Sequence, residues 1–232
     1  MKICGFQKLT TLDFPDKIAA TIFTHGCNLR CPFCHNASLV LRNLPEISKD
    51  EILSYLKKRQ GILDGVCITG GEPLLQNDLV DFITEIKKLG LLIKLDTNGA
   101  FPYQLQKILS LGIVDYVAMD LKNSPEKYPL TCGLKDKDPD EFFKSFKKSI
   151  AILMSGKIDY EFRTTIVPEL HTFSDIEKMG AEIRGAKRWY LQSFKDSGDL
   201  IEGNFTEPTH DFIKSLKAKA ENFAVLCEIR GI

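Results

Sequence analysis

Three cysteines stand close together in the segment CNLRCPFC, at positions Cys27, Cys31 and Cys34. Cysteine thiolates are the ligands that iron–sulfur clusters and other soft metal centres prefer. A cluster of four irons held by only three cysteines keeps one iron without a protein ligand, and such an iron can bind substrate. The spacing therefore suits an iron–sulfur centre that takes part in chemistry.

A structural zinc site is the main alternative, with His25 or His35 as the fourth ligand. His35 follows Cys34 directly, which is an awkward position from which to complete a tetrahedron. The simplest alternative is three cysteines that share no ligand, although a loop after Gly26 suits reactive cysteines better than packed ones. The spacing alone leaves all three interpretations open.

The cysteines follow the first of six apolar, β-branched segments that we interpret as buried strands. These segments are residues 18–23, 66–69, 92–97, 116–120, 160–167 and 189–194. Helical patterns lie between them: Ser48 with Glu51 and Ser174 with Glu177 match the capping box, and Asn77 is a further predicted N-cap. Alternating strands and helices predict an α/β fold with a parallel sheet and right-handed crossovers.

A complete eightfold barrel takes ~250 residues, and six strands leave this chain two units short. We therefore expect a partial (β/α)6 TIM-like barrel, open on one side, with the cysteine loop at its catalytic C-terminal end. Residues 1–232 are expected to form a single domain, with an N-terminal extension (1–17), a barrel core (18–194) and a C-terminal helix and strand (195–232). The polar stretch 123–141 is expected to be a surface excursion.

Composition excludes several classes of protein. The 232 residues carry 31 basic and 31 acidic side chains, so no net field draws the chain to nucleic acid or to a membrane surface. Apolar runs are far shorter than the ~18 residues of a membrane span, and the N-terminus lacks the apolar core of an export signal. We therefore expect a cytoplasmic protein without nucleic-acid or membrane partners. Seven cysteines, three of them clustered, do not suggest a disulfide framework.

Polar motifs follow the predicted strands. Gly70 and Gly71 allow the backbone to approach a ligand closely, and Glu72 offers an acceptor to an ammonium group. A plain strand-to-helix turn would look similar. Asp96 ends the third strand and Asp120 the fourth, so charged groups are expected to meet at one rim.

The same rim allows a simpler interpretation. Lys122 would form an ordinary ion pair there with Asp120 or Asp96. On the next strands, Arg163, Thr165 and Gln192 are expected to point into the barrel, where they would contact a ligand or satisfy core hydrogen bonds.

The cysteine segment resembles the CxxxCxxC motif of the radical S-adenosylmethionine (radical SAM) enzymes. The wider segment TLDFPDKIAATIFTHGCNLRCPFCHN is similar to the opening of activating enzymes for glycyl radical proteins, and most similar to that of the activating protein of anaerobic ribonucleoside-triphosphate reductase. The resemblance continues through GGEP and DTNG to MDLK, which is about half of the chain, and more loosely to the end.

This resemblance implies a partial barrel of the radical SAM type, with one 4Fe-4S cluster on Cys27, Cys31 and Cys34 and with bound S-adenosylmethionine. Reductive cleavage of that cofactor would generate a glycyl radical on a partner, with flavodoxin or ferredoxin as electron donor. The expected partner is anaerobic ribonucleotide reductase. Pyruvate formate-lyase, a small-molecule substrate, or a non-enzymatic zinc module are the alternatives.

The resemblance also assigns residues to ligands. Those implied for S-adenosylmethionine are Gly70, Gly71, Glu72, Asp96, Asn98, Asp120, Lys122, Arg163, Thr165 and Gln192. Those implied for a monovalent cation are Asp96, Thr97, Ala118 and Asp120. The cysteines at positions 4, 67, 132 and 227 form no CxxC pair, so no second cluster is expected, and Cys67 and Cys227 are interpreted as buried packing residues.

Overall fold

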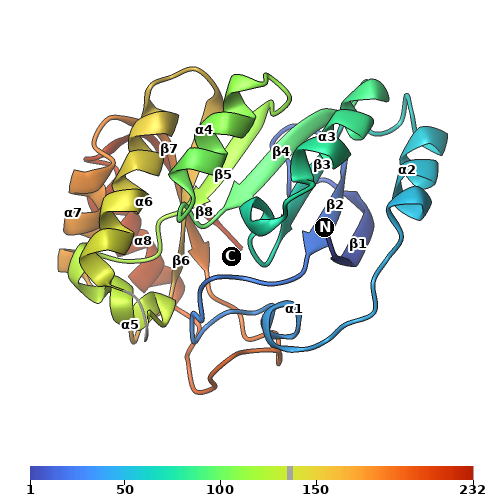
Figure 1. Cartoon of the computed structure of the whole chain (residues 1–232). Helices are drawn as coiled ribbons and strands as arrows, with labels where there is room; N and C mark the ends of the chain where they lie inside the picture. The colour runs from blue at the N-terminus through green and yellow to red at the C-terminus, as the bar shows by residue number, and fades with distance from the viewer. Residues whose placement is uncertain (135–137, 232) are drawn as a thin grey trace. The chain divides into compact units, whose positions relative to one another are not determined.

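A computed structural model describes residues 1–134 and 138–231, with strands and helices alternating along most of the chain (Figure 1). The strands are β1 (Ile3–Thr10), β2 (Ala19–Thr24), β3 (Gly65–Gly70), β4 (Leu92–Thr97), β5 (Tyr116–Asp120), β6 (Asp159–Ile166), β7 (Ala186–Ser193) and β8 (Ala224–Arg230). The helices are α1 (Ala37–Leu41), α2 (Lys49–Lys58), α3 (Leu79–Lys88), α4 (Pro102–Ser110), α5 (Tyr128–Cys132), α6 (Pro139–Met154), α7 (Phe173–Glu182) and α8 (His210–Ala220). Two 3-10 turns are η1 (Pro73–Leu75) and η2 (Pro125–Lys127).

The strands form one sheet in the order β1 to β8. Strand β2 pairs with β3, β3 with β4, β6 with β7 and β7 with β8, all in parallel, whereas β1 pairs with β2 antiparallel. Sequential order with parallel pairing is what alternating strands and helices produce. The sheet is not closed between β8 and β1 within the described residues, which confirms the predicted open α/β class.

The first compact unit comprises residues 1–28, 38–97 and 103–117. It contains strands β1 to β4, whose parallel register aligns Thr24 of β2 with Gly70 of β3. Its buried core includes Ile22, Ile68 and Leu95, one from each of three neighbouring strands, and none of these side chains is exposed. Apolar burial of this kind is the main stabilising contribution to such a unit.

The second compact unit comprises residues 29–37, 98–102 and 118–232. Strands β6 to β8 lie beside α7 and α8, and α8 packs on α7, β7 and β8 (Figure 1). Phe146, Phe162 and Trp189 are fully buried there, and the Trp189 indole donates to Thr164 Oγ1 at 2.9 Å. Burial of an indole is tolerated when its N–H finds such a partner. The prediction of a single domain remains a prediction.

Several local features differ from the prediction. Strand β1 lies in the segment expected to be an N-terminal extension, where no strand was predicted. Ser48 is the N-cap of α2 as predicted, but it accepts from Asp50 N at 3.2 Å and does not form the predicted capping box with Glu51. Asn77 is not the cap of α3, because Asp78 precedes that helix without a side-chain capping bond. The capping box of α7 is formed by Thr172 and Asp175, two residues before the predicted pair.

The stretch 123–141 is less exposed than predicted. Asn123, Tyr128 and Cys132 are buried, and Asn123 Nδ2 donates to Thr131 Oγ1 at 2.9 Å. Residues 135–137 lie outside the described residues. Across the described ranges, no helix combines the length and apolar character needed to cross a membrane.

Candidate active site

The loop that carries Cys27 begins directly after β2, in the first unit. Gly26 has a left-handed φ of 86°, its N–H donates to Leu39 O at 2.9 Å, and its carbonyl accepts from Glu72 N at 2.8 Å. Gly71 N donates to Thr24 O at 2.8 Å. The start of the cysteine loop and the Gly70–Glu72 turn are therefore held together by backbone hydrogen bonds.

The two glycines of this turn are required by close backbone approach. A Cβ on Gly70 would lie 2.3 Å from Thr24 N, and a Cβ on Gly71 would lie 1.9 Å from Gly26 O. Both separations are too short for any side chain. The structure brings Gly70 against the end of β2 and Gly71 against the start of the cysteine loop, and their approach to a ligand stays a prediction.

Glu72 is fully buried at the beginning of η1. Its Oε1 accepts from Leu74 N at 3.1 Å and from Thr97 Oγ1 at 2.8 Å. A buried carboxylate needs such donors, and two of them fix its orientation. Glu72 and Thr97, predicted for two different ligands, thus belong to one hydrogen-bonded group.

Asp96 lies in a buried cluster that the sequence analysis did not anticipate. Lys94, two residues earlier on β4, forms an ion pair with the Asp96 carboxylate, and only 1% of Lys94 is exposed. Cys67 of β3 contacts both partners, with its Sγ 3.7 Å from Asp96 Oδ1 and 3.7 Å from Lys94 Nζ. Cys67 is buried as predicted, and it packs against charges as well as apolar groups.

Cys31 and Cys34 belong to the second unit and share a tight turn, in which Cys34 N donates to Cys31 O at 3.0 Å. Cys31 is buried and Cys34 partly exposed. A hydrogen bond with the side chain of Cys132 lowers the pKa of Cys31, whereas burial raises the pKa of Cys34. Arg30 N also donates to Cys132 O at 3.0 Å, so α5 supports the cysteine loop.

Asp120, Lys122 and Arg163 form a compact charged cluster at the end of β5 and on β6. Lys122 Nζ lies 3.0 Å from Asp120 Oδ2, and Arg163 donates to Asp120 Oδ1 from Nε at 3.1 Å and Nη2 at 3.0 Å. Burial acts to raise the pKa of Asp120, but the charges of Lys122 and Arg163 prevail and lower it to about 2. Asp120 therefore stays ionised, and the predicted ion pair with Lys122 is confirmed.

His171 holds the backbone beside this cluster. It is buried, and its Nε2 lies 2.8 Å from Lys122 O while its Nδ1 lies 3.1 Å from Val167 N and O. Burial lowers the pKa of His171. His171 lies in the loop between β6 and α7, where it is buried and orients the backbone at Lys122 and Val167.

The parallel register aligns the predicted polar residues of β6 and β7. Thr165 pairs with Gln192, and Arg163 lies two residues before Thr165, so all three share one face of the sheet. Glu161 continues this face, and Arg230 of β8 donates to its two carboxylate oxygens at 2.6 and 2.9 Å. Sequence reasoning missed Glu161 and Arg230 because 69 residues separate them.

Asn98 and Ala118 complete the predicted set. Asn98 is buried and its Oδ1 accepts from Ala100 N at 3.0 Å, which fixes the turn after β4. Ala118 is fully buried on β5. The structure thus brings Glu72 and Thr97 together in the first unit, and Asp120, Lys122 and Arg163 together in the second.

The chemistry of the three cysteines fits an iron–sulfur cluster. Cys27 lies in the first unit, whereas Cys31 and Cys34 both lie in the second. In the part of the chain that the structure describes, no three side chains of His, Cys, Asp or Glu gather as ligands for a metal ion. Three thiols on one loop remain the donor set that a four-iron cluster with one open iron uses.

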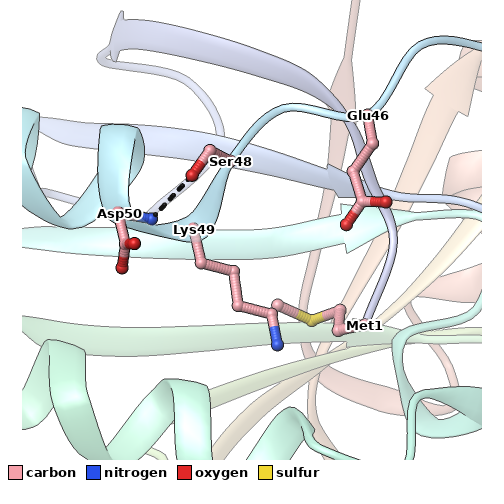
Figure 2. Close-up of a pocket in the computed structure, with 5 residues that line it drawn as sticks. All are labelled: Met1, Glu46, Ser48, Lys49 and Asp50. Carbon is pink, nitrogen blue, oxygen red and sulfur yellow. Dashed lines mark hydrogen bonds between the residues drawn. The ribbon is translucent and has the colours of Figure 1, made fainter.

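A surface pocket of the first unit lies beside the N-terminus, and none of the predicted site residues line it. The pocket is lined by Met1, Glu46, Ser48, Lys49 and Asp50 (Figure 2). Two of these residues are joined by the capping hydrogen bond from Asp50 N to Ser48 Oγ. Hydrogen bonds from Lys49 and the N-terminal amine, which both pair with Asp78, lower the pKa of that carboxyl to about 2. These contacts belong to the start of α2 and α3, and they bring no predicted site residue to the pocket.

Comparisons with known proteins identify the family of the chain. The sequence profile of the radical SAM superfamily matches residues 21–180. A protein of Methanocaldococcus jannaschii, provisionally named a glycyl-radical enzyme activating enzyme, is 30% identical over 99% of this chain and 96% of its own length. The pyruvate formate-lyase-activating enzyme of Listeria monocytogenes is 32% identical, over 55% of this chain and 56% of its own.

The fold has a counterpart among solved structures. A radical SAM methyltransferase from Sphaerobacter thermophilus superposes with a TM-score of 0.71, covering 96% of this chain and 69% of its own. The two sequences are only 15% identical, so the likeness concerns the fold. It agrees with the predicted partial TIM-like barrel.

Proposed function

The chain belongs to the radical SAM superfamily, among the glycyl-radical enzyme activating enzymes, and we propose that it generates a glycyl radical on anaerobic ribonucleoside-triphosphate reductase. Membership implies an enzyme that uses a 4Fe-4S cluster and S-adenosylmethionine. When bound and reduced, these two groups supply a carbon radical that takes a hydrogen atom from a glycine Cα.

Cys27, Cys31 and Cys34 would hold the cluster in this proposal. The observation that carries it is the joining of the cysteine loop to the Gly70–Glu72 turn, through the 2.8 Å bond from Glu72 N to Gly26 O. This joint fixes the start of the loop relative to the Glu72 carboxylate, within one unit. A cluster and a cofactor that must meet in one geometry need such a fixed frame.

Glu72 would accept the ammonium group of S-adenosylmethionine. Thr97 and Leu74 N orient its Oε1, so the carboxylate does not need to reorganise when the cofactor binds. In the second unit, Lys122 and Arg163 would attract the cofactor carboxylate, with Asp120 holding both cations in place. Asn98, Thr165 and Gln192 remain proposed contacts of the adenosine moiety.

The choice of partner rests on the N-terminal segment that precedes the cysteines. The alternative partner, pyruvate formate-lyase, is favoured by the Listeria relative, although the alignment with it covers only 55% of this chain. We propose flavodoxin or ferredoxin as electron donor, because the cluster must receive one electron for each cleavage.

A cytoplasmic location is proposed from the sequence.

Anaerobic reconstitution tests the proposal. The purified protein should carry iron and sulfide and release 5'-deoxyadenosine and methionine when reduced with S-adenosylmethionine. Incubation with the ribonucleotide reductase should then give the doublet of a glycyl radical in electron paramagnetic resonance. A glycyl radical signal that appears with pyruvate formate-lyase and not with the ribonucleotide reductase would show that pyruvate formate-lyase is the partner. Cofactor cleavage without a radical on either protein would point to a small molecule, and a colourless, zinc-loaded protein would contradict the whole proposal.

A further inference from the structure

Lys94 is a lysine buried inside the first unit. Only 1% of its surface is exposed, and its ammonium pairs with the Asp96 carboxylate. Lys94 and Asp96 are two residues apart on β4, so the strand period places both side chains on one face. Cys67 Sγ lies 3.7 Å from each partner and covers the pair from β3.

Burial of an ammonium group is unfavourable unless an opposite charge and hydrogen bonds compensate for it. Asp96 supplies that charge, and Lys94 in turn neutralises Asp96. The resemblance to activating enzymes implied a monovalent metal ion at this carboxylate. A protonated lysine already brings one positive charge and three hydrogen-bond donors to the same atoms, so the residues around Asp96 do not fit an additional metal ion.

The second carboxylate implied for the ion is neutralised as well. Lys122 and Arg163 contact Asp120 at 3.0 Å each. Each of the two acidic residues therefore carries at least one cation of its own unit.

We propose that Lys94 Nζ supplies from within the chain the positive charge that a monovalent metal ion would otherwise bring to Asp96, so that this enzyme needs no such ion. The tests that measure S-adenosylmethionine binding rest on the proposed function. The tests that measure the thermal midpoint of unfolding are independent of that function.

The wild-type protein gives the first test. Its midpoint of thermal unfolding and its dissociation constant for S-adenosylmethionine should be the same in potassium, sodium and tetramethylammonium chloride at equal ionic strength. Tetramethylammonium is too large to enter a buried site. A tenfold weaker affinity without potassium or sodium, about 1.4 kcal/mol, would overturn the proposal.

Two variants give the second test. Lys94→Ala removes the charge and leaves space for an ion beside Asp96, so it should bind S-adenosylmethionine at least about tenfold more weakly in tetramethylammonium. Potassium or sodium should restore both affinity and thermal midpoint. Lys94→Met removes the charge but fills the space, so neither ion should restore it. A merely structural lysine would not show this difference between the variants.

The outcomes separate the two claims. If Lys94→Ala matches the wild type in tetramethylammonium, or responds to potassium no more than Lys94→Met does, the inference is wrong. If Lys94→Ala does not fold under any condition, the inference is tested by the wild-type protein alone, through its thermal midpoint and affinity in the three salts. If no protein binds S-adenosylmethionine but the thermal midpoints follow the expected pattern, the proposed function fails and the charge replacement stands.

Discussion

The contact between Gly71 and Gly26 makes Gly71→Ala the most informative single substitution. The new Cβ would lie 1.9 Å from Gly26 O, whereas Cβ atoms keep at least 3.0 Å from other atoms, so the two backbones must move apart by about 1 Å. Two hydrogen bonds of 2.8 Å cross this joint, from Gly71 N to Thr24 O and from Glu72 N to Gly26 O. Both would lengthen beyond hydrogen-bonding distance.

Losing a buried hydrogen bond costs about 1–3 kcal/mol, so losing two should lower the free energy of unfolding by about 2–6 kcal/mol. For a chain of this size, that corresponds to a fall of about 4–24 °C in the thermal midpoint. Because the joint positions the cysteine loop, the variant should also retain less iron after anaerobic reconstitution.

Gly203→Ala is the matched control, since its Cβ meets no atom of the described residues within 4 Å. Calorimetry and iron analysis of both variants test the reasoning. If Gly71→Ala unfolds at the same temperature as Gly203→Ala and binds as much iron, the close approach is not a constraint on the loop.

Two further predictions concern buried carboxylates. Burial acts to raise the pKa of Asp175, but hydrogen bonds, first from Lys127, lower it from 3.8 to about 2, which corresponds to about 2 kcal/mol of stability. Because the folded-state pKa is lowered, this contribution is complete above pH 4 and disappears toward pH 2. Urea unfolding of Asp175→Asn should show a deficit of that size at pH 7 that narrows below pH 4, and a constant deficit would contradict the assignment. Arg230→Met leaves the buried carboxylate of Glu161 without its cation and should cost about 3–5 kcal/mol, whereas the double variant with Glu161→Gln should recover part of this loss in the same assay.

The sequence predicted those parts of the fold that depend on local patterns. Runs of β-branched residues marked the parallel strands, and Ser48 marked the start of α2 because a capping residue acts on its own helix. Strand β1 was missed because it lies at the edge of the sheet with mixed burial. The capping box of α7 was placed two residues late, since Ser174 offers the same local signature as Thr172.

The candidate site also contains residues that local patterns indicate and contacts that local patterns do not indicate. Residues such as Glu72 and Asp120 could be singled out because they lie at or just after the ends of predicted strands, but their partners depend on tertiary contacts. The ion pair of Glu161 and Arg230 joins segments 69 residues apart, so no local sequence pattern predicts it. The Lys94–Asp96 pair did leave a signal, because two charges two residues apart in a buried strand must share a face and neutralise each other.

We propose that Cys27, Cys31 and Cys34 hold a 4Fe-4S cluster whose open iron receives S-adenosylmethionine. Electron paramagnetic resonance of the reduced, anaerobically reconstituted protein, with and without the cofactor, is the decisive experiment. We expect a 4Fe-4S signal that changes when S-adenosylmethionine is added, that is lost in Cys31→Ala, and that persists in the buried control Cys227→Ala. A signal that does not respond to the cofactor, or that survives in Cys31→Ala, would contradict it.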